Sequence, residues 1–322
     1  MSHPRPEGAA GALAGTRVGD ALGGVVESLD PAQIEHRWGG RWDGLKPAAP
    51  GAASEMTCAV ARSLADFPDF NGADMARRLV DACTPERGYG RGTLAAIDRL
   101  RRGTPWREAA IAPGGRTSFG NGAAVRAAPV GLAYCRDAEA LRWVAEEQAG
   151  ITHAHALACE GAVLHAHAVA LALVTAGRSI DGPGFLLDIG REAQMREFRS
   201  RYETAARLAA RGSRPDRVVS NLGNGTSALG SVVTAAYCFA ASPDDFSGAV
   251  CLALALGGNA RSIASMTGAL AGARLGTGGI PPAWLAACDA DEPRASTMAE
   301  LGRRLLSGHS GRSRLGTGGR PE

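Results

Sequence analysis

The sequence predicts an all-α protein, and three observations lead to this fold class. Alanine-rich segments recur with apolar residues at positions i, i+3 and i+4, which is the spacing of one face of a helix. Extended runs in which β-branched residues alternate with polar ones are nearly absent. Proline and glycine separate the alanine-rich segments, as expected for short connections between helices.

The helical pattern predicts a series of helices along the chain. In order, the predicted helices are 56–66, 73–83, 92–102, 138–149, 155–176, 190–211, 227–241, 246–257 and 262–275. In the last of them, Gly268, Gly272 and Gly276 lie four residues apart. This spacing of small residues predicts a close approach between two helix backbones.

We expect a single domain over residues 11–306, since no internal repeat and no linker interrupts the pattern. Residues 1–10 are polar and proline-rich, and we expect them to form a flexible N-terminus. Residues 307–322 are rich in glycine, serine and arginine and are predicted to be a disordered, solvated tail rather than a binding arm.

Charge and aromatic content argue against a nucleic-acid partner. The formal net charge is +3, the arginines are dispersed, and aromatic residues make up 5% of the chain. A binding surface for DNA or RNA normally combines clustered basic side chains with stacking aromatic rings. We therefore expect no nucleic-acid partner.

The cysteines and the apolar segments bear on location. Seven cysteines are scattered without a paired C-x-x-C motif, which is typical of reduced thiols in a cytosolic protein. We find no signal-peptide pattern at the N-terminus and no uncharged apolar run of membrane-spanning length. A cytoplasmic location without a membrane partner is the resulting prediction.

Four segments are predicted to be loops at or near the starts of helices, where they could hold a ligand. They are 15–23 with the following Glu27, then 54–57, 118–126 and 256–262. Gly120-Asn121-Gly122 can expose backbone N–H donors at a helix start, an arrangement that favours phosphate, although such a triplet alone is more often a plain turn. Ser54 and Asn259 are both residue types that cap helix N-termini.

The order and spacing of these segments resemble the ADP-ribosylglycohydrolase family, which includes dinitrogenase reductase-activating glycohydrolase and the ADP-ribosyl-acceptor hydrolases. The resemblance runs from about Gly11 to Trp284. It rests on 19–23 with Glu27, 88–93, 120–129, 151–153, 257–258, 268–276 and 280–281. It implies an all-α orthogonal bundle with a ligand cleft at the helix ends, acting on an ADP-ribosyl or nucleotide-like small molecule.

Two motifs depart from the family pattern at its metal ligands. Active members carry Thr-Asp-Asp-Thr where this chain has residues 54–57, Ser-Glu-Met-Thr. They carry Gly-Gly-Asp-x-Asp-Thr where this chain has residues 257–262, Gly-Gly-Asn-Ala-Arg-Ser. In the family these aspartates and threonines hold two divalent cations, usually magnesium. The thioether of Met56 is a poor ligand for Mg²⁺, and Asn259 keeps an oxygen but loses the charge.

Arg261 is the most consequential departure, because a guanidinium is permanently charged. At an effective dielectric near 20, a unit positive charge and a divalent cation about 4 Å apart repel each other by about 8 kcal/mol. We therefore predict that the two magnesium ions are lost and that the chain has no metal cofactor. Our hypothesis is an ion pair between Arg261 and Glu55; the alternative is that Arg261 extends into solvent.

The resemblance also assigns candidate roles to other residues. The predicted acid–base groups are Glu55, Glu27 and His153, with Arg261 as an electrostatic replacement for the cations. Glu27 belongs to the flap that covers the cleft in relatives, whereas Asp20 is interpreted as a bracing carboxylate. The predicted ligand-binding residues are Gly120, Asn121, Gly122, Arg126, Gly257, Gly258 and Asn259.

The four histidines near position 160 are not interpreted as a metal site. His153 and His167 would lie about 21 Å apart on one helix. His155 and Cys159 form a pair four residues apart, but two ligands are too few for zinc. We interpret these histidines as solvated or core-edge residues.

Three functions remain open at this point. The first is an enzyme that acts on an ADP-ribosyl, NAD-derived or other N-ribosyl compound without the metal pair. The second is a non-catalytic protein that binds ADP-ribose. The third, an ordinary metal-dependent hydrolase, is disfavoured by the altered metal positions. The protein acceptor is unknown.

Overall fold

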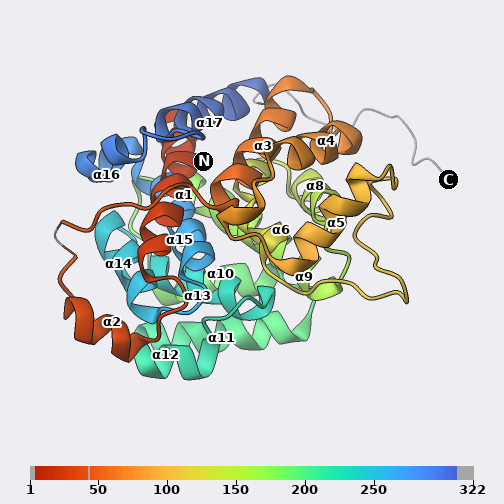
Figure 1. Ribbon diagram of the computed structural model, residues 1–322. Coiled ribbons are helices and arrows are strands. Elements are labelled where there is room, and N and C mark those ends of the chain that lie inside the picture. Colours follow the sequence, from red (N-terminus) through yellow and green to blue (C-terminus); the bar gives the residue numbers. More distant parts are fainter. Residues whose placement is uncertain (1–3, 43, 310–322) are drawn as a thin grey trace.

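The computed structural model describes residues 4–42 and 44–309, and within these ranges the chain is helical without a β-strand (Figure 1). An isolated bridge joins Gly120 to Ser227. The α-helices are α1 Pro6–Val26, α2 Pro31–Trp38, α3 Ala52–Asp66, α4 Gly72–Ala82, α5 Arg91–Arg101, α6 Gly122–Val125, α7 Ala128–Ala133, α8 Ala138–Gly150, α9 Ala156–Val174, α10 Gly182–Glu192, α11 Arg196–Ala210, α12 Pro215–Leu222, α13 Ala228–Ala241, α14 Phe246–Leu256, α15 Ala260–Leu275, α16 Pro282–Ala287 and α17 Ala295–His309. Two short 3₁₀ helices, η1 Pro85–Arg87 and η2 Thr277–Gly279, complete the list. The all-α prediction is confirmed.

The centre of the molecule is the pair α1 and α15, which lie side by side in Figure 1. A Cβ atom added at Gly268 would overlap the backbone oxygen of Gly15, and one added at Gly272 would overlap that of Gly11. Glycine at these positions lets the two backbones touch. The close approach predicted from the glycine spacing is therefore confirmed, and the partner helix is α1.

The interpretation of residues 15–23 as a loop is wrong. These residues are the middle of α1, where Gly15, Gly19 and Gly23 each face the backbone of α15. The glycines serve helix packing rather than turn formation. The helix also begins at Pro6, inside the segment 1–10 that we expected to be flexible, and residues 8–10 are buried.

Other boundaries differ from the predicted ones in explicable ways. The predicted helix 190–211 is divided between α10 and α11, because the backbone is extended at Ala193 and Met195. The Glu160 carboxylate accepts a hydrogen bond from the backbone N–H of Gln194, and Arg199 donates one to the backbone oxygen of Ala193. These two side-chain contacts stabilise the non-helical segment between α10 and α11. At the C-terminus, α17 includes residues 307–309 of the predicted tail, and residues 310–322 lie outside the described residues.

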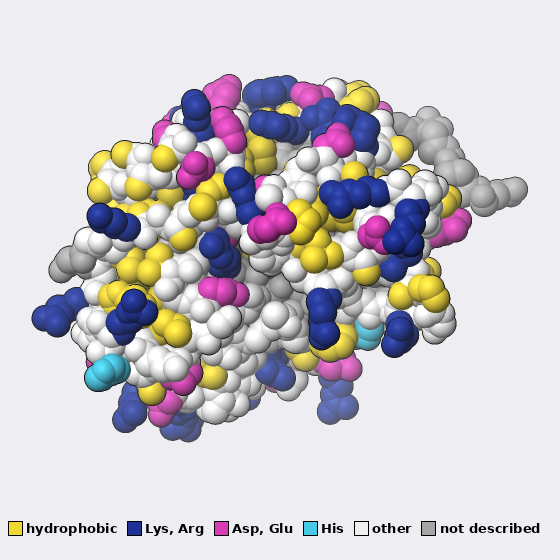
Figure 2. Space-filling view, viewed as in Figure 1, with side chains coloured by type: hydrophobic (Ala, Val, Ile, Leu, Met, Phe, Trp, Pro, Cys, Tyr) yellow, Lys and Arg dark blue, Asp and Glu magenta, His cyan; other side chains and the backbone are white. Residues whose placement is uncertain are grey.

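Helix α9 is mostly apolar and mostly buried, with Glu160, His165 and His167 as its ionisable residues apart from Cys159. Within the described residues it is the one helix that is long and apolar enough to cross a membrane by length and composition. However, 72% of that window is buried inside the protein, and a core helix of a globular protein passes the same test. On the face in Figure 2, basic and acidic side chains are interspersed rather than gathered into one patch.

Candidate functional site

A cavity of about 480 Å³ lies where the end of α1 meets the starts of α3, α5, α6 and α15. Most of its lining residues are polar, charged or glycine. The lining residues are Asp20, Glu27, Ala52, Ala53, Met56, Arg87, Gly88, Gly90, Arg91, Gly92, Thr93, Thr117, Ser118, Phe119, Gly120, Asn121, Gly122, Val125, His153, Thr226, Asn259, Arg261 and Ser262. Residues far apart in the sequence thus converge at helix ends, as the resemblance implied.

Glu27 ends α1 and faces the start of α15. Its Oε1 accepts a hydrogen bond of 2.9 Å from Nδ2 of Asn259, and its Oε2 accepts one of 2.8 Å from the backbone N–H of Arg261. Burial raises the pKa of the Glu27 carboxyl above its ordinary value near 4.5, and the two hydrogen bonds oppose that shift in part. Glu27 is therefore a largely buried carboxyl group with both oxygen atoms held by hydrogen bonds.

Two amide side chains extend this contact across the cavity. Asn121 Nδ2 donates to Oδ1 of Asn259 at 2.8 Å and to Oγ of Ser231 at 3.0 Å. Asn259 stands at the N-cap position of α15, but its side chain forms no cap hydrogen bond and bridges Asn121 and Glu27 instead. The structure thus brings three predicted site residues, Glu27, Asn121 and Asn259, into one hydrogen-bonded chain.

Arg261 pairs with Asp20 and not with Glu55, so the predicted ion pair is wrong. Its Nη1 lies 3.2 Å from Oδ1 of Asp20 and also donates to the backbone oxygen atoms of Asp20 and Ala49. The Arg261 side chain is 24% exposed, so it does not simply extend into solvent. Glycine makes room for it, because a Cβ atom at Gly24 would lie 2.5 Å from the guanidinium carbon and one at Gly51 would lie 2.7 Å from Nη1.

Asp20 is fully buried and braces the start of α3, as we expected. Its Oδ2 accepts hydrogen bonds from the backbone N–H of Gly51 at 2.7 Å and from the backbone N–H and hydroxyl of Ser54 at 3.2 and 2.5 Å. Gly51 occupies the N-cap position, so Ser54 is not the cap. Asp20 thus caps α3 from another helix and leaves its Oδ1 for Arg261.

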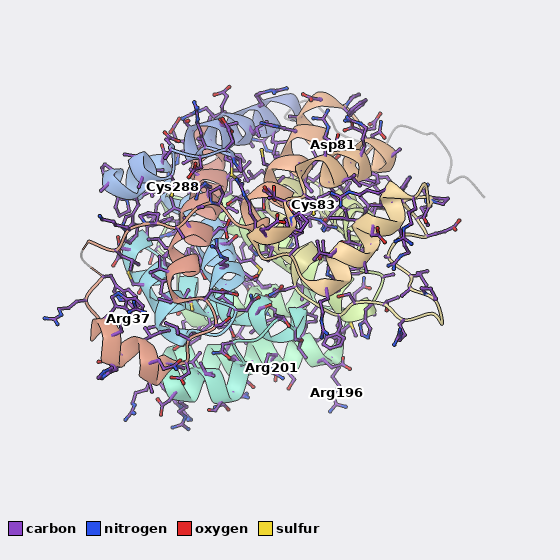
Figure 3. All side chains as sticks on the ribbon, in the orientation of Figure 1. Arg37, Asp81, Cys83, Arg196, Arg201 and Cys288 are labelled. Atoms are coloured by element: carbon purple, nitrogen blue, oxygen red, sulfur yellow. The ribbon has the colours of Figure 1, made fainter. Side chains whose placement is uncertain are left out.

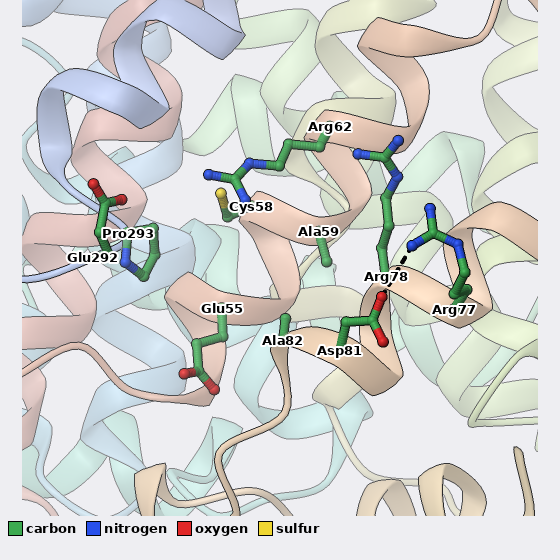
Figure 4. A pocket seen from close by; sticks show the side chains of 10 residues that line it. All are labelled: Glu55, Cys58, Ala59, Arg62, Arg77, Arg78, Asp81, Ala82, Glu292 and Pro293. Atoms are coloured by element: carbon green, nitrogen blue, oxygen red, sulfur yellow. Dashed lines mark hydrogen bonds and ion pairs between the residues drawn. The ribbon is translucent and has the colours of Figure 1, made fainter. Parts of the chain in front are cut away.

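Glu55 does not line this cavity. It borders a second one of about 350 Å³ on α3, where Figure 4 shows it at the opposite end from Arg62. Its carboxylate accepts hydrogen bonds from the backbone N–H and hydroxyl of Thr84 at 3.2 and 2.8 Å and from Oη of Tyr89 at 2.8 Å, and it pairs with Arg87 at 3.0 Å. Glu55 therefore anchors the segment 84–89 to α3 and lies outside the lining of the cavity that Glu27, His153 and Arg261 share.

His153 lies at the cavity wall, and its proton arrangement follows from its neighbours. Arg126 Nη1 donates to Oγ1 of Thr152 at 2.9 Å, and the same Oγ1 lies 2.7 Å from Nδ1 of His153. Burial, assisted by the positive charge of Arg126, lowers the pKa of His153 to about 3. The neutral ring then accepts the threonine hydroxyl at Nδ1 and carries its proton on Nε2. His153 is a hydrogen-bond donor at neutral pH rather than an acid–base group.

Three predicted ligand-binding residues are placed away from the cavity. Arg126 is fully buried and donates to Gln148, Thr152 and the sulfur of Met56. Gly257 and Gly258 have positive φ angles and pack against backbone, where added Cβ atoms would overlap the oxygen atoms of Leu29 and Asn224. These two glycines allow the turn between α14 and α15 to pack closely against Leu29 and Asn224.

Several lining residues were not predicted. Arg87, Arg91 and Thr93 come from the segment 87–93, whose glycine-rich pattern signals a loop but not the direction of its arginines. Phe119 is 55% exposed, and its ring meets the His155 ring edge-on at 5.9 Å. An exposed aromatic side chain beside a glycine-rich turn is a signal that sequence reasoning could have used.

The residues at this site do not fit a pair of magnesium ions. Among the described residues, no group of three or more His, Cys, Asp and Glu side chains is arranged to hold a metal ion. The carboxylates that line the cavity are Asp20 and Glu27, and both already contact Arg261. Magnesium prefers several free oxygen ligands in octahedral geometry, which this donor set does not offer.

The structure is an all-α bundle with a cavity at its helix ends that holds a buried carboxyl group, and comparisons with known proteins identify its family. The family model for ADP-ribosylglycohydrolase matches residues 1–314. The chain belongs to the ADP-ribosylglycohydrolase family.

Individual relatives agree with this assignment. The chain is 31% identical to ADP-ribosylhydrolase ARH3 of Homo sapiens, with 88% of this chain and 89% of that protein covered. It is 29% identical to the ADP-ribosyl-(dinitrogen reductase) glycohydrolase of Rhodospirillum rubrum, with coverage of 87% and 90%. A solved structure described as an ADP-ribosylglycohydrolase-related protein complex superimposes with a TM-score of 0.71 at 27% identity, covering 95% of this chain and 99% of that one. Family and relatives support a glycosidic hydrolase.

Proposed function

We propose that this protein binds an ADP-ribosyl, NAD-derived or other N-ribosyl compound in the 480 Å³ cavity and hydrolyses its glycosidic bond without a dinuclear metal centre. The observation that carries this proposal is the contact between Arg261 and Asp20. The permanent positive charge of Arg261 would repel divalent cations at this place. The guanidinium pairs with the buried Asp20 carboxylate in place of a metal ion.

Glu27 is the group that we propose moves a proton. Burial raises its pKa in the direction that favours a proton-carrying carboxyl group, and Asn259 and the Arg261 backbone hold its two oxygen atoms in place. As an acid, Glu27 would protonate the leaving group; as a base, it would take a proton from the attacking water. A glycosidic cleavage through an oxocarbenium-like state can use carboxyl groups in this way.

Positive charge and neutral donors would complete the site. The Nε and Nη2 atoms of Arg261 form no hydrogen bond to any residue in the described ranges, so they can bind a hydroxyl or phosphate oxygen of the ligand. Arg91 lies at the exposed edge of the cavity and adds a second cation. His153 Nε2–H offers an uncharged donor beside Gly122.

Binding of ADP-ribose without turnover is the second candidate. It is favoured by the fact that Asp20 is committed to Ser54, Gly51 and Arg261, which leaves Glu27 as the remaining carboxyl group in the lining of the cavity. A protein acceptor is not specified by these residues. The cytoplasmic location stays a proposal.

One experiment tests the proposal in two stages. Thermal unfolding is measured with ADP-ribose, in magnesium and in EDTA; a ligand at 100 times its Kd adds about 2.7 kcal/mol of stability, and we expect the same shift in both buffers. Turnover of an ADP-ribosyl-arginine or NAD-derived substrate is then compared between the parent, Glu27→Gln and the matched exposed variant Glu35→Gln. Loss of about a hundredfold or more in Glu27→Gln alone supports catalysis. Binding without turnover in the parent assigns the second candidate, and a shift that requires magnesium contradicts both.

A further inference from the structure

Arg126, at the end of α6, is a fully buried cation whose hydrogen bonds go to uncharged groups. Its Nε donates to Oε1 of Gln148 at 2.8 Å, and its Nη2 donates to the backbone oxygen of the same residue at 2.7 Å. Gln148 is fully buried as well, and its own Nε2 donates to the backbone oxygen of Ala123 at 3.1 Å. The other partners of Arg126 are Thr152 and the sulfur of Met56. Two bonds to one fixed side chain therefore set the direction in which the remaining nitrogen of the guanidinium points.

Thr152, in the turn between α8 and α9, connects this arginine to His153. Its Oγ1 accepts a hydrogen bond of 2.9 Å from Nη1 of Arg126 and lies 2.7 Å from Nδ1 of His153. A guanidinium has no acceptor atom, and no other atom of the described residues forms a hydrogen bond with this hydroxyl, so the threonine proton points to Nδ1. Because burial lowers the pKa of His153 to about 3, the ring carries a single proton, which is left on Nε2.

Nε2 of His153 lies on the side of the ring that faces the candidate active-site cavity. A Cβ atom added at Gly122 would lie 3.3 Å from Nε2, and one added at Gly120 would lie 3.7 Å from it; both glycines line the cavity. His153 is 2% exposed, and Nε2 forms no hydrogen bond with a residue in the described ranges. A buried donor without an acceptor is costly, so an acceptor atom of a ligand beside Gly122 would be favoured.

We propose that Thr152 is a positioning residue: its hydroxyl, directed by Arg126, keeps the His153 proton on Nε2, where it donates to an acceptor oxygen atom of the ligand. This proposal rests on the function proposed above, because it concerns a ligand in the same cavity. The opposite tautomer would present a lone pair to that oxygen atom and repel it. The charge of Arg126 also polarises the chain of hydrogen bonds towards the cavity, which strengthens Nε2–H as a donor.

Nitrogen-15 NMR of the ligand-free, full-length protein with labelled histidine locates the proton at neutral pH. The chain has seven histidines, and the signals of His153 are those missing from His153→Gln. We expect Nε2 to be protonated and Nδ1 to be unprotonated. Thr152→Val removes the hydroxyl at nearly unchanged volume and should move both chemical shifts towards a mixture of tautomers, whereas Thr152→Ser should restore the parent spectrum. Thr267→Val, which removes a fully buried hydroxyl on α15, is the matched control and should leave the His153 signals unchanged.

Isothermal titration with ADP-ribose then measures what the tautomer contributes to binding. Thr152→Val should weaken the affinity about tenfold, the effect of one lost hydrogen bond, and Thr152→Ser should bind like the parent. Arg196→Gln, whose side chain points away from the body of the molecule in Figure 3, is the surface control and should also bind like the parent.

The outcomes separate this proposal from the function on which it rests. A proton on Nδ1 in the parent, a parent-like spectrum in Thr152→Val, or a change of tautomer without loss of affinity would each overturn the role of Thr152. If Thr152→Val does not fold, the parent spectrum still decides, because a protonated Nδ1 contradicts the proposal. A parent protein that does not bind ADP-ribose would instead contradict the proposed function, while the ligand-free spectra would still show whether Thr152 sets the tautomer.

Discussion

Nη1 of Arg261 lies 3.2 Å from Oδ1 of Asp20, and the backbone N–H of the same arginine donates to Glu27. One residue at the start of α15 therefore touches both carboxylates of the candidate active site. Gly24 and Gly51 leave the space that its guanidinium needs. Asp20 is thus engaged by the guanidinium of Arg261 and Glu27 by its backbone N–H.

Arg261→Met should lower the stability of the protein at neutral pH. Removing the guanidinium leaves the fully buried Asp20 without its positive partner, and breaking a buried pair on one side costs about 3 kcal/mol. Urea unfolding monitored by circular dichroism measures the change. Arg196→Met, an exposed substitution on α11, is the control and should stay within about 0.5 kcal/mol. Equal stability of the two variants would show that the pair contributes little.

Glu55→Gln should affect stability and not turnover. The amide cannot pair with Arg87, and one of its two oxygen positions becomes a donor that faces Thr84 or Tyr89, so we expect a loss of about 2 kcal/mol. Tyr89→Phe, which removes a single donor to the same carboxylate, should cost about 1 kcal/mol. A large fall in turnover with unchanged stability would restore Glu55 as a catalytic group.

His165 should make the protein sensitive to acid. Its ring is fully buried with Nε2 lacking a hydrogen-bond partner in the described structure, and burial lowers its pKa from 6.5 to about 3. The unfolded chain takes up a proton below about pH 6.5 and the folded chain does not, so stability is lost as pH falls towards 3. Each such histidine contributes a slope of about 1.4 kcal/mol per pH unit. His165→Leu should reduce the measured slope between pH 6 and pH 4 by about that amount, and an unchanged slope would argue against the low pKa.

Gly268→Ala should destabilise the protein even though alanine favours a helix. The added methyl group meets the backbone oxygen of Gly15, and forcing α1 and α15 apart costs about 2 kcal/mol or more. Gly150→Ala is the matched control, since nothing lies within 4 Å of a Cβ atom there. The control should gain up to about 1 kcal/mol from helix propensity. A neutral Gly268→Ala would mean that the two helices can separate without loss.

The helices that could be predicted are those with a strong pattern of their own. The segments that became α3, α4, α5, α8, α13, α14 and α15 were found to within a few residues of their bounds. Helix α1 was missed because its glycines look like loop residues until they are matched with those of α15. The signal was present, since Gly11, Gly15, Gly19 and Gly23 repeat every four residues. Helices α2, α12 and α16 begin at Pro31, Pro215 and Pro282, a helix-start signal that we did not use.

For the candidate site, the sequence predicted which residues take part better than it predicted which side chains they contact. The sequence led us to expect that Arg261 pairs with Glu55 or extends into solvent, whereas its pairing with Asp20 depends on side-chain direction in the first turn of α3. Consecutive helical residues point about 100° apart, so Ser54 faces Asp20 while Glu55 faces Thr84. Such directions are set by packing between helices and cannot be read from local spacing.

The measurement that tests the central claim most directly is metal analysis of the purified full-length protein, combined with substrate turnover before and after chelation. Elemental analysis should find less than stoichiometric magnesium or manganese, and EDTA should leave both ADP-ribose binding and turnover unchanged, because Arg261 holds Asp20 and Glu27. The triple variant Met56→Asp, Asn259→Asp, Arg261→Asp restores carboxylates at the altered positions and should gain a magnesium-dependent rise in melting temperature that the parent lacks. Two tightly bound divalent ions per chain in the parent, or turnover that chelation abolishes, would contradict the account.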